Sequence, residues 1–296
     1  MKTPATDSLA ALSASLRIVW TSAPAWILPV ALLSVIGELP EAWLRYSARG
    51  YYAELTAGGG MEPLGVQALA MAGLIGLMFS LTMQLVAVAW GFLVISEVAA
   101  GRPAGIAEGL RRTLAWRLQL SWLVSAFLVS TAHRLWFIGG CFLLLPFGFA
   151  PSDAYERATG MSAISRAGKL GFSVGPHGGK LGVPMAIVST GLLLATAVID
   201  TVLSTVNAML SPAVNLGGLT DLVARLTSSP GSAVDLLGAV VMAILPEPSV
   251  AGVALTLLEA PWPVLAQIVV FAVPVVVYHD AMRIDAARER PVLDPT

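Results

Sequence analysis

Long apolar runs alternate with short polar stretches along the whole chain. The apolar runs cover residues 20–39, 64–96, 118–150, 181–206 and 260–278. An α-helix needs about 20 mostly apolar residues to cross the hydrocarbon core of a bilayer, which is about 30 Å thick. Each run is long enough to do so, and the runs carry few charges. The pattern therefore predicts an all-α, polytopic membrane protein.

The run 118–150 is the ambiguous one, because His133-Arg134 interrupts it. It is either one long helix or a hairpin of two short helices. The flanking stretches 97–117 and 151–180 each carry four Lys or Arg residues, and the positive-inside rule places both in the cytoplasm. Two flanks on one side require an even number of crossings. We therefore predict a hairpin with His133-Arg134 at its outer tip.

The stretch 207–259 is predicted to stay outside. Its apolar segment Leu236–Leu245 has ten residues and is too short to span. A crossing here would also move the basic residues after 282 to the outer side. We expect an outer loop with a re-entrant or interfacial helix.

The predicted topology has six spans, with both termini in the cytoplasm. It makes residues 1–296 a single integral membrane domain of three hairpins, at about 20–96, 118–150 and 181–278, with a short cytoplasmic tail at 279–296. Thirteen of the 17 basic residues then lie inside, and the four outside are Arg45, Arg49, Arg134 and Arg225.

A short amphipathic helix is predicted at the cytoplasmic side before each hairpin. The three segments are Leu9–Val19, Ile106–Trp116 and Gly160–Leu170. In the third segment Ile164, Ala167 and Leu170 share one face, opposite a face of Ser, Arg and Lys side chains. Asp7 is placed to cap the first segment. These segments indicate a threefold repeat, although any helix that enters a membrane tends to be amphipathic at its base.

Composition supports the membrane class and excludes others. The chain is 56% hydrophobic and 12% charged, against about 25% charged residues in a soluble domain. A net charge of −1 argues against nucleic-acid binding. Three His and one Cys leave little for a metal site and allow no internal disulfide. Neither G-x-S-x-G nor H-E-x-x-H occurs. We predict no catalytic residue, cofactor or metal, and no enzyme activity.

Polar residues inside or beside the spans are the remaining candidates for function. Asp200 lies in the fifth predicted span with Ser204 and Asn207 nearby. An acid within a span is a candidate ion or proton site, unless it sits at the outer interface. Glu97 follows the second run, and we expect it to pair with Arg102 or Arg111. Seven Trp residues near span ends are typical of an aromatic belt: Trp20, Trp26, Trp43, Trp116, Trp122, Trp136 and Trp262.

Two groups of cytoplasmic basic residues are candidate contacts for anionic lipid headgroups. A Lys or Arg near an anionic leaflet gains about 1 kcal/mol. We expect the apolar faces Ile106-Leu110-Leu114 and Ile164-Ala167-Leu170 to enter the membrane interface and hold these residues there. The alternative is that their charges only set the topology. The candidate residues are Arg111, Arg112, Arg117, Arg166, Lys169 and Lys180.

Three segments resemble a known family of membrane proteins. They are Gly101-Arg102-Pro103 followed by Gly109–Leu114, the stretch Tyr155–Leu170, and Val277–Arg283. In these segments the chain resembles bacterial six-span proteins related to the integral membrane domain of glycerophosphodiester phosphodiesterases. Two positions depart from the family pattern: Ser165-Arg166 has the reverse order, and His279 replaces a Tyr. No phosphodiesterase domain is found in these 296 residues, so the resemblance implies a membrane fold without esterase activity.

Two functions are compatible with these observations. The first is a non-catalytic protein of the bacterial cytoplasmic membrane that scaffolds or assembles partners, or associates with lipid. The second is the permease subunit of an ABC-2-like exporter, which would need a separate ATPase because no nucleotide-binding motif is present. This second reading rests on fold-level analogy.

Overall fold

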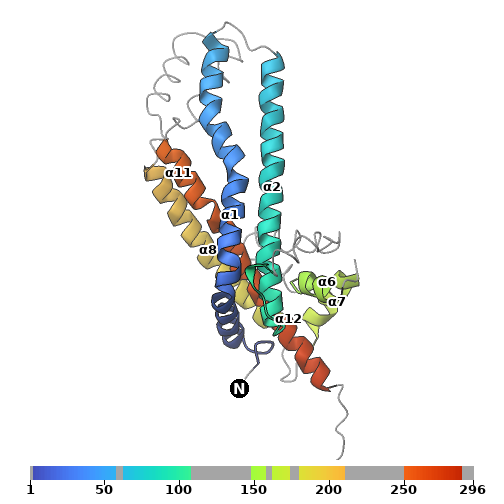
Figure 1. The fold of residues 1–296 in the computed structure, drawn as a ribbon. Helices are drawn as coiled ribbons and strands as arrows, with labels where there is room; N and C mark the ends of the chain where they lie inside the picture. The colour runs from blue at the N-terminus through green and yellow to red at the C-terminus, as the bar shows by residue number, and fades with distance from the viewer. Residues whose placement is uncertain are drawn as a thin grey trace, which may run out of the picture. The chain divides into compact units, whose positions relative to one another are not determined.

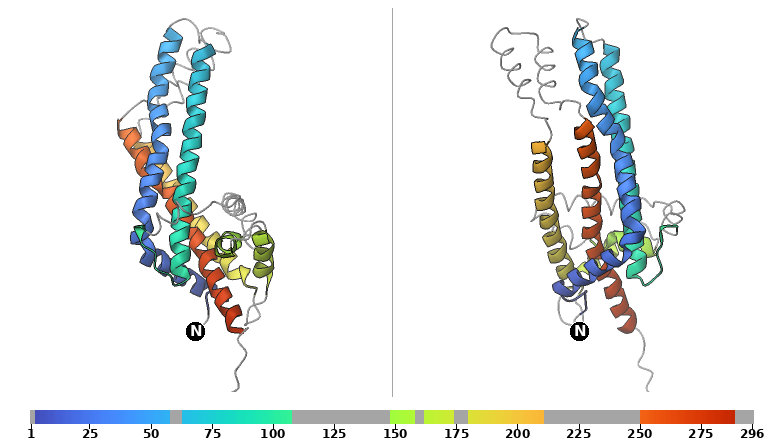
Figure 2. Two further views of the ribbon diagram at one scale, coloured as in Figure 1. Left: turned by 45° about the vertical axis from the view of Figure 1, so that its right-hand side comes forward. Right: turned by 60° about the vertical axis from the view of Figure 1, so that its left-hand side comes forward.

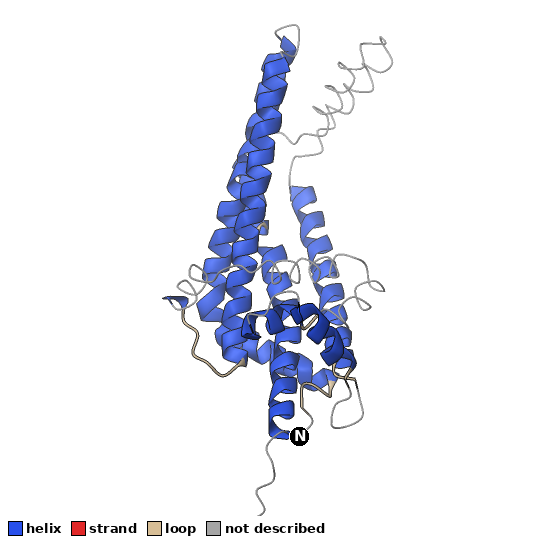
Figure 3. Cartoon of the chain, turned by 90° about the vertical axis from the view of Figure 1, so that its right-hand side faces the viewer, coloured by secondary structure: helices blue, strands red, loops and turns tan. Residues whose placement is uncertain are grey.

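The computed structural model describes residues 3–57, 63–107, 148–157, 162–173, 180–210 and 250–288. These residues fold into α-helices joined by turns and loops, with no β-strand among them (Figure 3). The helices are labelled in Figure 1. They are α1 (Ser8–Ala57), α2 (Pro63–Ala99), α6 (Ala150–Arg157), α7 (Ser162–Phe172), α8 (Gly182–Leu210), α11 (Val250–Glu259) and α12 (Pro261–Arg288).

Four described stretches are long and apolar enough to cross a membrane. They are Ser8–Pro40, Met71–Ala99, Gly182–Leu203 and Val253–Ile284. They overlap four of the predicted apolar runs, which confirms an α-helical architecture compatible with a multi-pass membrane protein. The predicted hairpin at 118–150 lies outside the described residues except for its last three positions. Leu236–Leu245 also lies outside them, so six spans remain a prediction.

The first helix is longer than its hydrophobic run. Asp7 caps α1 as predicted, since its Oδ1 accepts hydrogen bonds from the backbone N–H of Leu9 (2.9 Å) and Ala10 (3.4 Å). The predicted amphipathic helix at Leu9–Val19 is present as the first part of α1 and leads directly into the apolar stretch. Figure 2 shows that these turns run at an angle to the rest of α1. Pro24 lacks a backbone N–H and crowds the preceding turn, which favours such a bend.

The last apolar helical stretch begins earlier than the sequence pattern indicated. We predicted a loop up to residue 259, but Val250–Glu259 forms α11, and the apolar stretch starts at Val253. No Pro or charged residue interrupts positions 250–258, so nothing stops a helix there. Pro261 then begins α12, a position where its missing N–H removes no helical hydrogen bond.

The chain divides into two compact units, and the long helices run through both. Unit 1 contains Met1–Val30, Val88–Val198 and Val264–Thr296, and unit 2 contains Ala31–Ala87 and Ile199–Pro263. In unit 2, α1 and α2 approach closely, because a Cβ added at Gly37 would lie 2.9 Å from the Cβ of Met83. Most large apolar side chains of α2 from Met71 to Leu85 are exposed, as expected for surface in contact with lipid.

Unit 1 holds an apolar core to which several segments contribute. Residues before and within the start of α1, the start of α6, part of α7, the start of α8 and the C-terminal half of α12 pack together. Its members are Ala5, Ala11, Phe149, Ala150, Ala167, Leu181, Met185, Val188, Val273, Val277, Tyr278 and Ala281.

The C-terminal part of α2 packs against α1 and α12 within unit 1. A Cβ added at Gly91 would overlap the side chain of Ile268, so α2 approaches α12 at a position where only Gly fits without a shift. Against α1, the indole Nε1–H of Trp90 donates to the carbonyl of Ala25 at 3.3 Å. In a regular helix that carbonyl would accept from residue 29, which is a Pro and has no N–H. Trp90 therefore satisfies a carbonyl that Pro29 leaves without its donor.

The polar flanks predicted to share one side of the membrane meet at one end of unit 1. The backbone N–H of Ala5 donates to Asp280 at 2.9 Å, and Arg283 Nη2 donates to the carbonyl of Ala99 at 2.7 Å. These contacts join the segment before α1, the end of α2 and the end of α12, while Leu181, just before α8, lies in the same core. The helix ends are thus grouped as the charge count requires.

Candidate functional site

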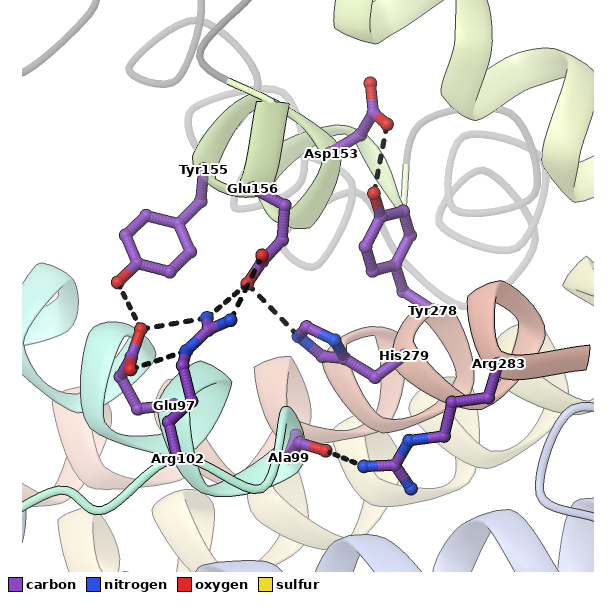
Figure 4. Close-up of polar contacts among 9 residues, drawn as sticks. All are labelled: Glu97, Ala99, Arg102, Asp153, Tyr155, Glu156, Tyr278, His279 and Arg283. Atoms are coloured by element: carbon purple, nitrogen blue, oxygen red, sulfur yellow. Dashed lines mark hydrogen bonds and ion pairs between the residues drawn. The ribbon is translucent and has the colours of Figure 1, made fainter. Parts of the chain in front are cut away.

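Charged and aromatic-polar side chains gather at this end of unit 1 (Figure 4). We call this group the polar cluster. It consists of Glu97, Arg102, Asp153, Tyr155, Glu156, Arg166, Tyr278 and His279. It joins the end of α2 to α6, and α6 in turn to α7 and α12.

The turn after α2 places Arg102 beside Glu97. Gly101 has a φ of 79°, in the left-handed region that favours glycine. The N–H of Gly101 bonds to the carbonyl of Val98 at 3.0 Å, and the N–H of Arg102 bonds to the carbonyl of Glu97 at 2.8 Å. This pair of bonds is a Schellman motif, which satisfies carbonyls at the helix end. Because the chain turns back here, a local glycine determines the position of the Arg102 side chain.

Arg102 lies between two carboxylates from different elements. Its Nε and Nη2 donate to the two oxygens of Glu97 at 2.7 and 2.9 Å, and Nη2 also donates to Glu156 at 2.6 Å. Tyr155 donates its hydroxyl to Glu97 at 2.6 Å. The Glu97 side chain is 2% exposed, so it needs these partners. Hydrogen bonds to Glu97 and Glu156 raise the pKa of Arg102, which stays charged.

Asp153 is the second buried acid of the polar cluster. Its side chain is 5% exposed and lies in the first turn of α6. It accepts two hydrogen-bonding contacts from Arg166 of α7, at 2.8 Å from Nε and 2.7 Å from Nη2. Tyr278 of α12 donates its hydroxyl to the other oxygen at 3.0 Å. A single carboxylate thus connects α6 to both α7 and α12.

His279 completes the cluster on α12. Its Nε2 lies 3.8 Å from Glu156 Oε1, and its ring meets the ring of Tyr278 edge-on at 5.4 Å between centroids. Nε2 is buried and has no hydrogen-bond partner within the part of the chain that the structure describes. Among the described residues, no group of three or more His, Cys, Asp or Glu side chains could hold a metal ion.

The arrangement is that of a structural ion-pair network. Each of the acids Glu97, Asp153 and Glu156 faces an arginine, and two of them also accept a phenolic hydroxyl. Glu97 and Asp153 are buried, and their oxygens bond to side chains of neighbouring elements. What the network does chemically is to neutralise buried charge where helix ends meet.

Comparisons with known proteins do not extend this picture. No family model, no curated protein and no solved structure matches the chain. The polar cluster nevertheless draws its members from all three segments on which the family resemblance rests. Arg102, Tyr155 and His279 come one from each segment and lie in the same network. The relation to the membrane domain of glycerophosphodiester phosphodiesterases stays a prediction.

The predicted intramembrane polar site is described only in part. Asp200 lies on α8 within the apolar stretch Gly182–Leu203, but its side chain and those of Ser204 and Asn207 are outside what the structure describes. The neighbouring Thr201 and Thr205 are exposed, and Thr205 donates its hydroxyl to the carbonyl of Thr201 at 2.7 Å.

The predicted lipid contacts fall into three groups. Arg111, Arg112 and Arg117 lie outside the described residues. Arg166 is engaged with Asp153, whereas Lys169 and Lys180 are exposed.

One expectation about α7 was wrong. Its apolar face does not enter the membrane interface but packs on the core of unit 1, where Ala167 is 1% exposed and Ile164 and Leu170 are partly buried. The helix itself is amphipathic as predicted. Protein rather than lipid covers its apolar side.

The predicted pairing of Glu97 with Arg102 was correct.

The aromatic-belt prediction was wrong for Trp26, which is 2% exposed and donates its indole N–H to Ser22, whereas Trp20 is 81% exposed. The sequence analysis did not single out Asp153 or its partner Tyr278. For Asp153 the available signal was its position just after an apolar run, because an acid there needs a partner from a neighbouring helix end.

Proposed function

We propose that this chain is a non-catalytic integral protein of the bacterial cytoplasmic membrane that organises lipid or partner proteins. The observation that carries the proposal is the ion-paired polar cluster. It joins several helix ends, and its buried acids Glu97 and Asp153 are held by arginines and phenolic hydroxyls. Such a joined polar end suits attachment or assembly.

The full topology is part of this proposal. We infer six crossings, with the polar cluster on the cytoplasmic side. Support comes from the charge split of the sequence and from the grouping of helix ends in unit 1. If the end of α2 and the start of α8 lie on one side of a membrane, the chain between them crosses an even number of times. A hairpin at 118–150 meets that requirement.

A permease subunit of an ABC-2-like exporter is the alternative. It shares the six-span layout, but it would need a nucleotide-hydrolysing partner at the cytoplasmic end. No contact in the described residues favours it over the first proposal. The two functions differ most clearly in what binds the purified protein.

Purification in a mild detergent separates the two proposals. The tagged protein is isolated from its native membrane, and the co-eluting proteins and lipids are identified by mass spectrometry. We expect phospholipid and no stoichiometric ATPase. An ATPase that co-purifies at fixed stoichiometry, and whose hydrolysis rate rises on binding, would favour the exporter. A matched sample carrying Arg102→Met, which disturbs the polar cluster, shows whether a captured partner depends on that end of the protein.

A further inference from the structure

An exposed aromatic side chain lies beside two lysines at the end of α7. Phe172 is 52% exposed, although it directly follows the buried Gly171. The Lys180 ammonium lies 5.5 Å from the centre of the Phe172 ring, within the usual distance for a cation–π contact. Lys169 is exposed one turn before Phe172, and side chains three positions apart share a helix face.

The backbone fixes this group rather than leaving it on a free loop. The N–H of Leu181 donates to the carbonyl of Ser173 at 3.1 Å, so the end of α7 and the beginning of α8 are held together. The opposite side of α7 is anchored in the core through Ala163 and Ala167. Lys169, Phe172 and Lys180 therefore project from backbone positions that are held together, and we call these three residues the Lys–Phe patch.

The position of the patch along the chain places it near a membrane surface. The apolar stretch of α8 starts at Gly182, two residues after Lys180, and its outward residues Val183 and Ile187 are exposed and apolar. A span that starts at Gly182 puts Lys180 at headgroup depth. Because Phe172 contacts Lys180, the patch lies at the same level. An aromatic ring flanked by ammonium groups is suited to the boundary between headgroups and acyl chains.

The basic residues of the patch are lysines, whereas most other basic residues of the chain are arginines, whose charges can set the topology without binding a particular lipid. The chain has 17 basic residues but just three lysines, and two of them belong to the patch. Arg166, on the same helix, is bound to the buried Asp153 and leaves the lysines as the exposed cations of α7 and its junction with α8. A lysine is a compact charge on a flexible stem and can follow a phosphate without fixed geometry.

We propose that the Lys–Phe patch binds the headgroup of an anionic phospholipid, with both ammonium groups at the phosphate and the Phe172 ring against the upper acyl chain. This inference rests on the proposed membrane location and goes further by naming the lipid class and the residues. It does not rest on Arg166, whose guanidinium is bound to Asp153.

The test measures lipid preference at the patch in nanodiscs. The protein is reconstituted with phosphatidylcholine alone or with added phosphatidylglycerol, and amine-reactive labelling of Lys169 and Lys180 is followed by mass spectrometry. We expect slower labelling of both lysines when phosphatidylglycerol is present. Inorganic phosphate added to phosphatidylcholine nanodiscs should leave the labelling unchanged, which separates a lipid headgroup from a free anion.

Variants give a second readout. Lys169→Gln and Lys180→Gln should each lower the ratio of retained phosphatidylglycerol to phosphatidylcholine by about fivefold, the equivalent of one basic residue at an anionic surface. Arg17→Gln, which removes an exposed cation on α1, is the matched control and should have a smaller effect.

Equal labelling in both lipid mixtures, or the same retained ratio in the folded Lys variants as in the wild type, would overturn the proposal. Those results would leave the proposed function standing. A protein that fails to insert into any bilayer would instead contradict the membrane location.

Discussion

Replacing Arg102 by methionine is expected to lower the free energy of unfolding by about 3 kcal/mol. Removing one partner of a buried ion pair costs about 3–5 kcal/mol, because the other charge stays buried without compensation. Glu97, with 2% of its side chain exposed, would lose both guanidinium contacts while the Tyr155 hydroxyl stays in place. The lower part of the range applies because the Arg102 side chain is 41% exposed. Denaturation of the purified protein by a harsh detergent measures the loss.

Two further variants test the cause of that loss. Arg283→Met removes an arginine from the same end of unit 1, but it uncovers only the carbonyl of Ala99, so we expect a loss of about 1 kcal/mol. Adding Glu97→Gln to Arg102→Met removes the uncompensated charge and should recover part of the stability. Similar losses in both arginine variants, with no recovery in the double variant, would mean that the ion pairs do not hold the cluster together.

Trp90→Phe should destabilise the contact between α1 and α2 by about 1–3 kcal/mol, the cost of a buried polar group left unsatisfied. The phenyl ring keeps most of the apolar contact but cannot donate to the carbonyl of Ala25. Within α1, Pro29 has no N–H to offer in its place. The free energy of unfolding is measured as for Arg102.

A double-mutant cycle isolates the hydrogen bond from the change in ring size. Pro29→Ala restores a backbone N–H that can donate to the Ala25 carbonyl. In that background Trp90→Phe should cost clearly less than in the wild type, and the difference is the interaction energy between the two positions. If Trp90→Phe costs the same in both backgrounds, the effect comes from packing alone and the carbonyl does not depend on Trp90.

The helical architecture could be predicted from sequence because its cause is local. A run such as 64–96 has no charge, and in a bilayer only a helix satisfies its backbone groups within the segment. The grouping of helix ends was also accessible, since basic residues fix it. Boundaries were less predictable. Helical residues 40–57 follow the first hydrophobic run, and helical residues 250–259 precede the last one. Helix formation does not stop where hydrophobicity falls.

Of the contacts in the polar cluster, only the one between residues close in sequence could be predicted. Glu97 and Arg102 are five residues apart, and the turn at Gly101 between them allows their pairing to be predicted from the sequence. Asp153 and Tyr278 are 125 residues apart in sequence, and their contact depends on how α6 packs on α12. The buried face of α7 was misjudged for the same reason. Amphipathic spacing shows which face is apolar but not whether lipid or protein covers it.

We propose that the chain crosses a bacterial cytoplasmic membrane six times, with the polar cluster and both termini on the cytoplasmic side. Reporter fusions made after selected residues test it most directly, using one reporter that is active inside and one that is active outside. We expect cytoplasmic signals after Gly105, Gly175 and Asp294, and outside signals after Gly59, Arg134 and Ser228. Signals on opposite sides after Gly105 and Gly175 would contradict this topology. Both positions are close in sequence to members of the polar cluster, which must lie on one side of the membrane.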